Sequence, residues 1–94
     1  MSSALRSEFI TVTSTSTTDY QVVDLSGAVE TVFGVRFGSE SGFLTNEPYA
    51  TSPRLSLQTT MTNPIVTRSN DDRLFWVSAS AAAAVLEVWI IRRG

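Results

Sequence analysis

The sequence predicts one all-β domain over residues 1–94, either a β-sandwich or a jelly-roll-like barrel of about seven strands. Runs rich in Val, Ile, Thr and aromatic residues recur along the chain, as in strands. In most of these runs an apolar residue returns at every second position, and polar or Gly/Pro-containing turns separate the runs. The predicted strands are residues 8–13, 20–25, 29–37, 54–60, 65–68, 74–78 and 85–92.

The densest apolar run closes the chain at residues 85–92. In an extended strand its two faces are Leu86, Val88 and Ile90 on one side, and Val85, Glu87, Trp89 and Ile91 on the other. Both faces are mostly apolar, which is unusual for a strand with one face in water. We therefore expect this strand to be central in a two-layer core or to contact another subunit. Glu87 is either an exposed or ion-paired strand residue, or an interface partner for an arginine.

Small residues separate this run from the aromatic strand at residues 74–78. Residues 79–84 have the sequence ASAAAA. They form either a turn or the first turn of a helix, because alanine favours helices. A helix over residues 81–93 would be apolar nearly all round and rich in Val, Ile and Trp. We therefore predict a hairpin with small residues at its bend.

The run at residues 29–37 has the clearest alternation in the chain. Its core-facing stripe is predicted to be Val29, Thr31, Phe33, Val35 and Phe37. Gly34 belongs to the opposite face, where a glycine in a strand indicates a bulge or a close contact with another backbone. Leu55 and Leu57 in the next predicted strand are also expected to face inward.

Residues 38–53 form the longest irregular stretch. Two glycines and two prolines make a continuous helix or a central strand unfavourable there. Loops of this length tend to be functional or interfacial. Its apolar residues, Phe43, Leu44 and Tyr49, either pack under a sheet edge or contact a partner.

Composition excludes several kinds of chemistry. The chain has no cysteine, histidine or lysine, which rules out disulfides, Cys/His zinc sites, a Ser-His-Asp triad, a Schiff-base lysine and a P-loop. A net charge of −2 does not fit a general nucleic-acid binder. Asp71 and Asp72 fit a turn, whereas Glu40, Asn46 and Glu47 are calcium-type oxygen ligands without the usual calcium-loop spacing. We expect no enzyme activity, no metal and no cofactor.

The ends of the chain are polar. Residues 1–7 are expected to be a flexible arm, and they lack the apolar region of a secretory signal, so we expect synthesis in a cytosol. The last apolar run is too short to span a bilayer, and no membrane association is expected. Arginine is the sole cation type, which suits pairing with carboxylates across interfaces. Arg92 and Arg93 are interpreted as a solubilising terminus.

Residues 74–94, LFWVSASAAAAVLEVWIIRRG, join an aromatic strand, a small-residue turn and an apolar strand. This arrangement resembles small Ser/Thr/Ala-rich β proteins of tailed bacteriophages. The resemblance implies a virion part made in the host cytoplasm, such as a capsid decoration, cement or neck protein. Such proteins adhere to a major capsid or connector protein, commonly as homo-oligomers with trimers favoured. No fixed motif is matched, so no residue role follows from it.

The leading hypothesis is a non-enzymatic virion structural protein that binds and stabilises a capsid or head–tail surface by burying apolar surface. The predicted partner interface is Phe43, Leu44, Tyr49, Glu87 and Trp89. The alternative is a carbohydrate-binding β-sandwich, in which Tyr49 or a tryptophan stacks on a sugar ring. A carboxylate-only glycosidase ranks third, because 94 residues leave little room for a cleft with two placed acids.

Overall fold

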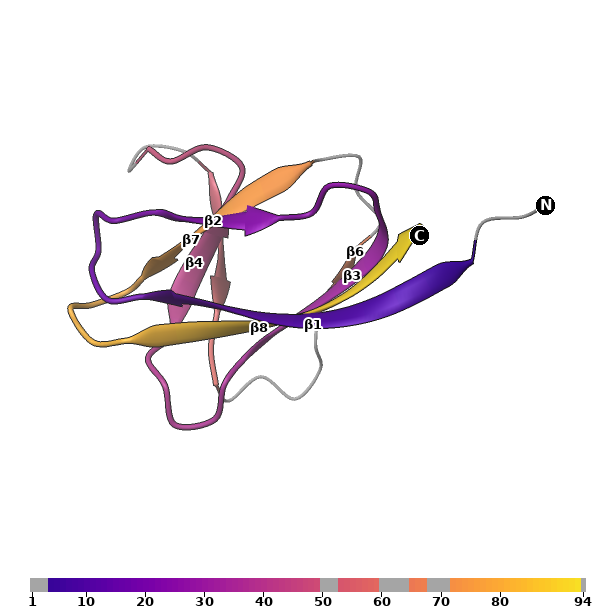
Figure 1. Ribbon diagram of the computed structural model, residues 1–94. Coiled ribbons are helices and arrows are strands. Elements are labelled where there is room, and N and C mark those ends of the chain that lie inside the picture. The colour runs from indigo at the N-terminus through magenta and orange to yellow at the C-terminus, as the bar shows by residue number, and fades with distance from the viewer. Residues whose placement is uncertain (1–3, 50–52, 60–64, 68–71, 94) are drawn as a thin grey trace.

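The fold is a β-sandwich, as predicted (Figure 1). The computed structural model describes residues 4–49, 53–59, 65–67 and 72–93, and these form two open antiparallel sheets. Sheet A has the strand order β1-β8-β3-β6, and sheet B has the order β2-β7-β4-β5. No helix in the described ranges is long and apolar enough to cross a membrane. The strands are β1 (Leu5–Ser14), β2 (Gln21–Asp24), β3 (Ala28–Val35), β4 (Gly42–Thr45), β5 (Arg54–Leu57), β6 (Ile65–Thr67), β7 (Arg73–Ser78) and β8 (Ala84–Arg93).

The core lies between the two sheets, and the residues that β8 and β7 turn inward dominate it. Leu86, Val88 and Ile90 are fully buried, as the period of two in β8 requires. Trp76 of β7 is also fully buried, and its Nε1 donates a hydrogen bond of 2.9 Å to the carbonyl oxygen of Ala84. This bond joins the two sheets and satisfies the indole donor inside the core.

The prediction of a closing hairpin is wrong, although its small-residue bend is confirmed. β7 belongs to sheet B and β8 to sheet A, so the two strands do not pair. The segment between them contains no helix and crosses from one sheet to the other. Ala84, placed in the turn by the sequence, is the fully buried first residue of β8. Two consecutive strands joined by a short loop can pair as a hairpin or belong to different sheets, and the local alternation of residues is the same in both cases.

One strand was missed. β4 lies inside the stretch that was predicted to be irregular, and it pairs with β7 on one side and β5 on the other. The first residue of this strand is Gly42, a position where the neighbouring residues leave no space for a side chain. A Cβ atom at Gly42 would lie 2.5 Å from Cζ2 of Trp76 and 2.7 Å from the carbonyl oxygen of Val77. The glycine therefore permits the close approach of Trp76 instead of breaking the strand.

The predicted core stripe of β3 is correct in the middle and wrong at its end. Thr31 and Phe33 are buried, but Phe37 lies beyond the end of the strand and is 94% exposed. The bulge in β3 lies between Ala28 and Glu30, where the pairing with β8 shifts, and not at Gly34. In β5, Leu57 is buried as predicted, whereas Leu55 is exposed at the end of an edge strand.

Both termini are more ordered than predicted. Residues 5–7, assigned to a flexible arm, belong to β1 and pair with β8. Arg92 is not a solubilising tail residue, because its side chain is only 15% exposed. It donates to the carbonyl oxygens of Asp24 and Ser26 and to a carboxylate oxygen of Glu8. The predictions at residues 1–3, 50–52, 60, 68 and 71 lie outside the described residues.

Candidate functional site

The face of sheet A that points away from the core carries exposed aromatic side chains. The register places Phe9 of β1, Trp89 of β8 and Val32 of β3 side by side across it. In the next row of the same face, Thr11, Glu87 and Gly34 lie side by side. We call this surface the outer face of sheet A and define it by Phe9, Thr11, Val32, Gly34, Arg36, Glu87 and Trp89.

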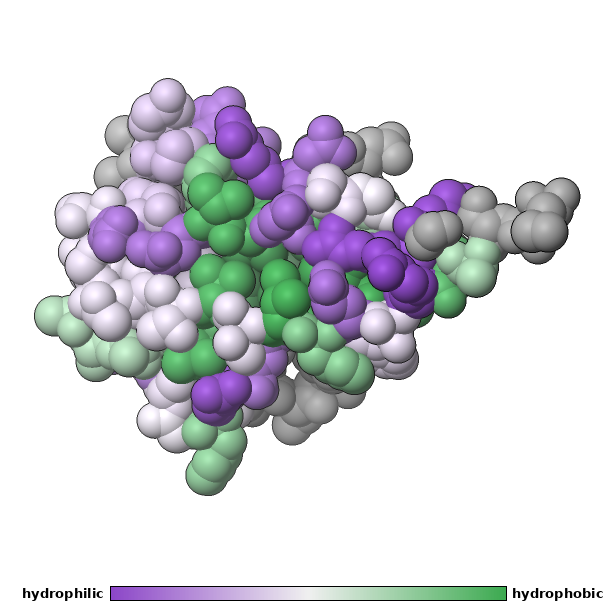
Figure 2. All heavy atoms as spheres, viewed as in Figure 1, coloured by the Kyte–Doolittle hydropathy of each residue, from purple (hydrophilic) through white to green (hydrophobic). Residues whose placement is uncertain are grey.

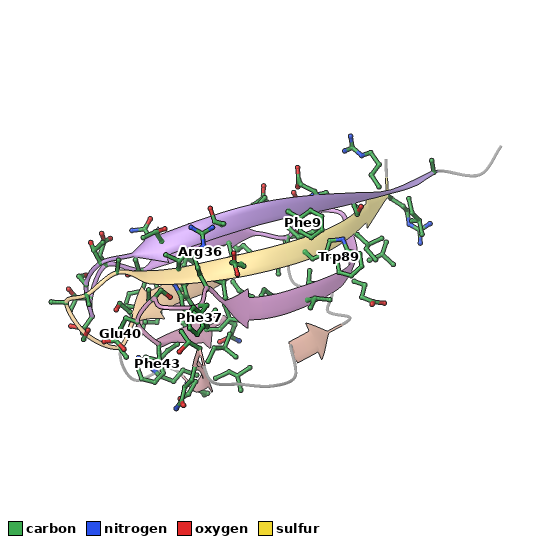
Figure 3. The ribbon with its side chains drawn as sticks, turned by 90° about the horizontal axis from the view of Figure 1, so that it is seen from below. Phe9, Arg36, Phe37, Glu40, Phe43 and Trp89 are labelled. Carbon is green, nitrogen blue, oxygen red and sulfur yellow. The ribbon has the colours of Figure 1, made fainter. Side chains whose placement is uncertain are left out.

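The main feature of this face is a stacked aromatic pair (Figure 3). The ring centroids of Phe9 and Trp89 are 5.8 Å apart, and the ring planes are inclined by 12°. Phe9 is 76% exposed and Trp89 is 42% exposed. Directly opposed aromatic residues stabilise a strand pair by up to about 1 kcal/mol. That stabilisation leaves most of the Phe9 ring in water, so the pair is suited to further burial by a ligand or partner.

A hollow of about 370 Å³ lies beside the aromatic pair. Its lining combines the Phe9 and Trp89 rings with Thr11, Glu87 and the backbone at Gly34. A Cβ atom at Gly34 would meet nothing within 4 Å, so the missing side chain leaves the floor of the hollow open. Among the described residues, no backbone atom lies within 4 Å of the position that a Cβ atom of Gly34 would take, so the predicted close contact is not found there. The glycine instead leaves space beside an aromatic platform.

Glu87 is an ion-paired, exposed strand residue, as one of the two predictions stated. Its Oε2 lies 3.2 Å from Nε of Arg36, and both side chains are about half exposed. A pair in this environment contributes at most about 1 kcal/mol to stability. It places one positive and one negative charge at the border of the apolar area.

The opposite face of the sandwich is partly covered by its own side chains. Val77 points away from the core on β7, yet it is fully buried. Tyr20, the residue before β2, and Arg54 of β5 come from the two edges of sheet B, and Nη2 of Arg54 donates to the Tyr20 hydroxyl at 3.0 Å. The Arg54 guanidinium also lies over the Phe43 ring, 4.9 Å from its centroid. Part of the apolar surface of this face is therefore covered, whereas Val22 of β2, which lies opposite Phe75, is 52% exposed.

The five residues predicted as a partner interface are not brought together. Glu87 and Trp89 share the outer face of sheet A. Phe43 belongs to the covered face of sheet B, and Tyr49 is exposed next to it, with its carbonyl oxygen 3.5 Å from Nη2 of Arg54. Leu44 is a core residue with 6% exposure, which corrects its assignment to an interface. Phe43 and Leu44 alternate in β4, so one points to each side of the sheet.

Carboxylates in the described part of the chain serve local structure. Glu40 accepts hydrogen bonds from the Ser80 hydroxyl at 2.7 Å and from the Ser41 amide at 2.8 Å, and these bonds lower its pKa. Glu40 thereby ties the β3–β4 connection to the β7–β8 connection. The described residues contain no group of three acidic side chains that could hold a metal ion. Asp24 caps the β2–β3 turn through the Ser26 amide, which lowers its pKa in the same way.

Sequence reasoning missed Phe9, Val32 and Arg36 as members of this face. The alternation in residues 8–13 separates Phe9 from Ile10, but it does not say which strand lies beside it. β1 and β8 are separated by most of the chain, and only their pairing brings Phe9 next to Trp89. No local signal in the sequence reports that contact.

Comparisons of the chain with models of protein families, with curated proteins and with solved structures give no match. The chemistry of the outer face of sheet A is therefore interpreted from its own residues.

Proposed function

We propose that the protein is a non-enzymatic structural module that binds another protein through the outer face of sheet A. The observation that supports this is the Phe9–Trp89 pair, a rigid aromatic surface that the fold leaves in water. Aromatic residues with few rotatable bonds dominate the centres of protein interfaces. The Arg36–Glu87 pair at the border supplies charges of both signs that fix the orientation of a partner.

The partner we propose is a capsid or connector surface of a bacteriophage, as the resemblance of residues 74–94 implies. On a repeating lattice, many copies with modest affinity act together, so one small apolar face per copy is enough. The binding step requires burial of the aromatic pair and no covalent chemistry.

The experiment measures the affinity of the purified chain for capsids of the phage that carries its gene. The original chain is compared with the variants Trp89→Ser and Thr13→Ser. Loss of a central interface aromatic weakens binding by about thirtyfold or more, which corresponds to 2 kcal/mol. Thr13 is a solvent-exposed neighbour on the same side of β1, so Thr13→Ser is expected to bind like the original chain. Absence of the chain from those capsids, or unchanged binding by Trp89→Ser, contradicts the proposal.

The hollow beside the aromatic pair favours carbohydrate binding as a second candidate. A sugar ring can stack on Trp89 while Thr11 and Glu87 offer hydrogen-bonding groups beside it. Trp76 is fully buried, so a change in tryptophan fluorescence upon adding glycans reports Trp89. A saturable shift with one glycan supports this candidate, and a flat response across the panel rejects it.

A further inference from the structure

One edge of the sandwich differs from the others in length and regularity. β2 and β5 bound sheet B with four residues each, and β6, of which three residues are described, bounds one side of sheet A. β1 bounds the other side with ten residues, and its pairing with β8 continues without a bulge. It contains no proline and no lysine. Natural sheets protect their edges with prolines, bulges or charged side chains. Of these devices β1 has only the charges of Arg6 and Glu8, so it is a template for a strand whose charges match them.

The backbone of β1 is oriented for such pairing. The Arg36 amide donates to the carbonyl oxygen of Val85 at 3.0 Å, so the backbone groups of Val85 point toward β3. Backbone direction alternates along a strand, so the even-numbered residues of β8 point toward β1. Through the register, the even-numbered residues of β1 bond to β8. The amide and carbonyl groups of Leu5, Ser7 and Phe9 therefore point away from β8, to the free edge.

The side chains at this edge are complementary to themselves in an antiparallel arrangement. The sequence Leu5–Arg6–Ser7–Glu8–Phe9 reads apolar, positive, serine, negative, apolar. When Ser7 lies opposite Ser7 of a second copy, Arg6 lies opposite Glu8 and Leu5 lies opposite Phe9, twice over. We propose that β1 pairs in this register with β1 of a second copy, which joins sheet A of both copies into one continuous sheet.

Hydrogen bonding and charge select this register. Leu5, Ser7 and Phe9 then form the hydrogen-bonded pairs, and Arg6 and Glu8 form the closer, non-hydrogen-bonded pairs, where side chains interact best. Centring the pairing on Arg6 or Glu8 puts like charges opposite each other. Centring it on Phe9 puts Arg6 opposite Val12 and leaves both charges against apolar residues.

Arg6 gains a partner that its own chain does not supply. Across the ladder it faces Arg92, a like charge, and in the described part of the chain it makes no ion pair. Glu8 accepts from Arg92 at 2.9 Å and is half exposed, so it can also accept from Arg6 of a second copy. Opposite charges across a strand pair are favourable, and like charges are unfavourable.

The shape of the molecule leaves this edge accessible. The N-terminal half of β1 and the end of β8 project as a ribbon beyond sheet B (Figures 1 and 3). Over the body of the sandwich, Figure 2 shows hydrophobic surface between β1 and β2, the neighbouring edges of the two sheets. In the proposed pair, Leu5 and Phe9 point to the outer side in both copies. The pairing therefore places two Phe9–Trp89 pairs on one face.

Cysteine crosslinking tests the register. The chain has no cysteine, so Ser7→Cys introduces a single thiol. In a hydrogen-bonded antiparallel pair the two Cα atoms lie about 5.5 Å apart, within disulfide range. We expect Ser7→Cys to form a disulfide-linked dimer under mild oxidation. Thr11→Cys is the matched control on the same edge, because this register separates the two thiols by roughly 27 Å along the strands.

Charge reversal tests whether the Arg6–Glu8 pairs hold the proposed dimer together. Light scattering of the isolated chain across a dilution series is expected to give a dimer, in place of the trimer implied by the phage resemblance. Arg6→Glu and Glu8→Arg each put like charges opposite each other, and each is expected to raise the dimer dissociation constant about tenfold or more. The double variant, Arg6→Glu with Glu8→Arg, restores opposite charges and is expected to return to within about threefold of the original.

These measurements use the isolated protein, so their outcome does not depend on the proposed binding function. A monomer at every concentration overturns the pairing, as does a trimer. Crosslinking through Thr11→Cys with none through Ser7→Cys overturns the register. Failure of the double variant to recover dimerisation, with circular dichroism showing intact β structure, overturns the role of the charges.

Discussion

The two outward faces of the sandwich differ in how they treat apolar residues of central strands. β7 and β8 both carry apolar side chains on each side, and both lie between two neighbours in their sheets. On β7, Val77 points outward and is buried, and Tyr20 and Arg54 are hydrogen-bonded to each other on the same face. On β8, Trp89 points outward and remains exposed. Whether an outward apolar residue of a central strand is buried therefore depends on side chains that come from the edges of its sheet, and not on the sequence of the central strand.

The difference between the two faces indicates which of them is available to bind a partner. On sheet B, Arg54 and Arg73 lie over the Phe43 and Phe75 rings, and Phe75 and Val77 are buried on this face, although Val22 is 52% exposed. On sheet A the stacked rings of Phe9 and Trp89 are left in contact with water, next to an open hollow. An apolar face that the fold does not use is available for binding.

The largest expected difference is between two phenylalanines. Phe75 on sheet B is buried beneath the Arg73 guanidinium, whereas Phe9 on sheet A is largely exposed. Phe75→Ala is expected to lower the free energy of unfolding by about 3 kcal/mol through the cavity it creates. Phe9→Ala is expected to change it by less than about 1 kcal/mol, because only the stacking contact is lost. Urea unfolding followed by circular dichroism measures both, and equal losses would contradict the contrast.

Two glycines give the next comparison. Gly42→Ala drives a methyl group into the Trp76 ring and the Val77 carbonyl, with an expected loss of about 2 kcal/mol. Gly34→Ala meets open space, and alanine suits a strand better than glycine, so stability is expected to rise by about 0.5 kcal/mol. Thermal unfolding of both variants gives the sign of each effect. A lower melting temperature for Gly34→Ala would contradict the open space beside Gly34, because the added methyl group would then meet other atoms.

Removing the cover of sheet B should make its face resemble that of sheet A. Arg54→Ala loses the bond to Tyr20 and the contact with the Phe43 ring, which together are expected to cost about 1 kcal/mol. It also exposes Val77, so binding of a hydrophobic dye such as ANS should increase. Arg36→Ala on sheet A is the control, since it breaks an exposed ion pair and uncovers no buried residue. Unchanged dye binding by Arg54→Ala would show that other groups cover this face.

The smallest effect concerns the connections at one end of the sandwich. Hydrogen bonds from Ser80 and Ser41 lower the pKa of Glu40, so its ionised form favours the folded state. That contribution is present above the ordinary carboxyl pKa and is lost as pH falls through the lowered value. Melting temperatures of the original chain and Glu40→Gln should therefore differ at neutral pH and converge in acid. Glu47→Gln, an exposed residue nearby, controls for net charge, and a constant difference at all pH values would contradict the role of Glu40.

The sequence by itself determined the all-β class, most strands and how the side chains of each strand divide between its two faces. The alternation in β8 puts Leu86, Val88 and Ile90 on one side whatever lies beside them, because side-chain direction is a local property of an extended chain. Turn residues limited the strand ends to within a few positions. The missing residue types set limits on the chemistry in the same direct way.

Only the tertiary structure decided which strands are neighbours and which outward faces are covered. β7 and β8 are adjacent in sequence yet belong to different sheets, whereas β1 and β8 come from opposite ends and pair along their whole length. Gly42 reads as a breaker until Trp76 is placed against it. Strand order, sheet exchange and the contact of Phe9 with Trp89 depend on interactions between residues far apart in the chain, and local periodicity carries no information about them.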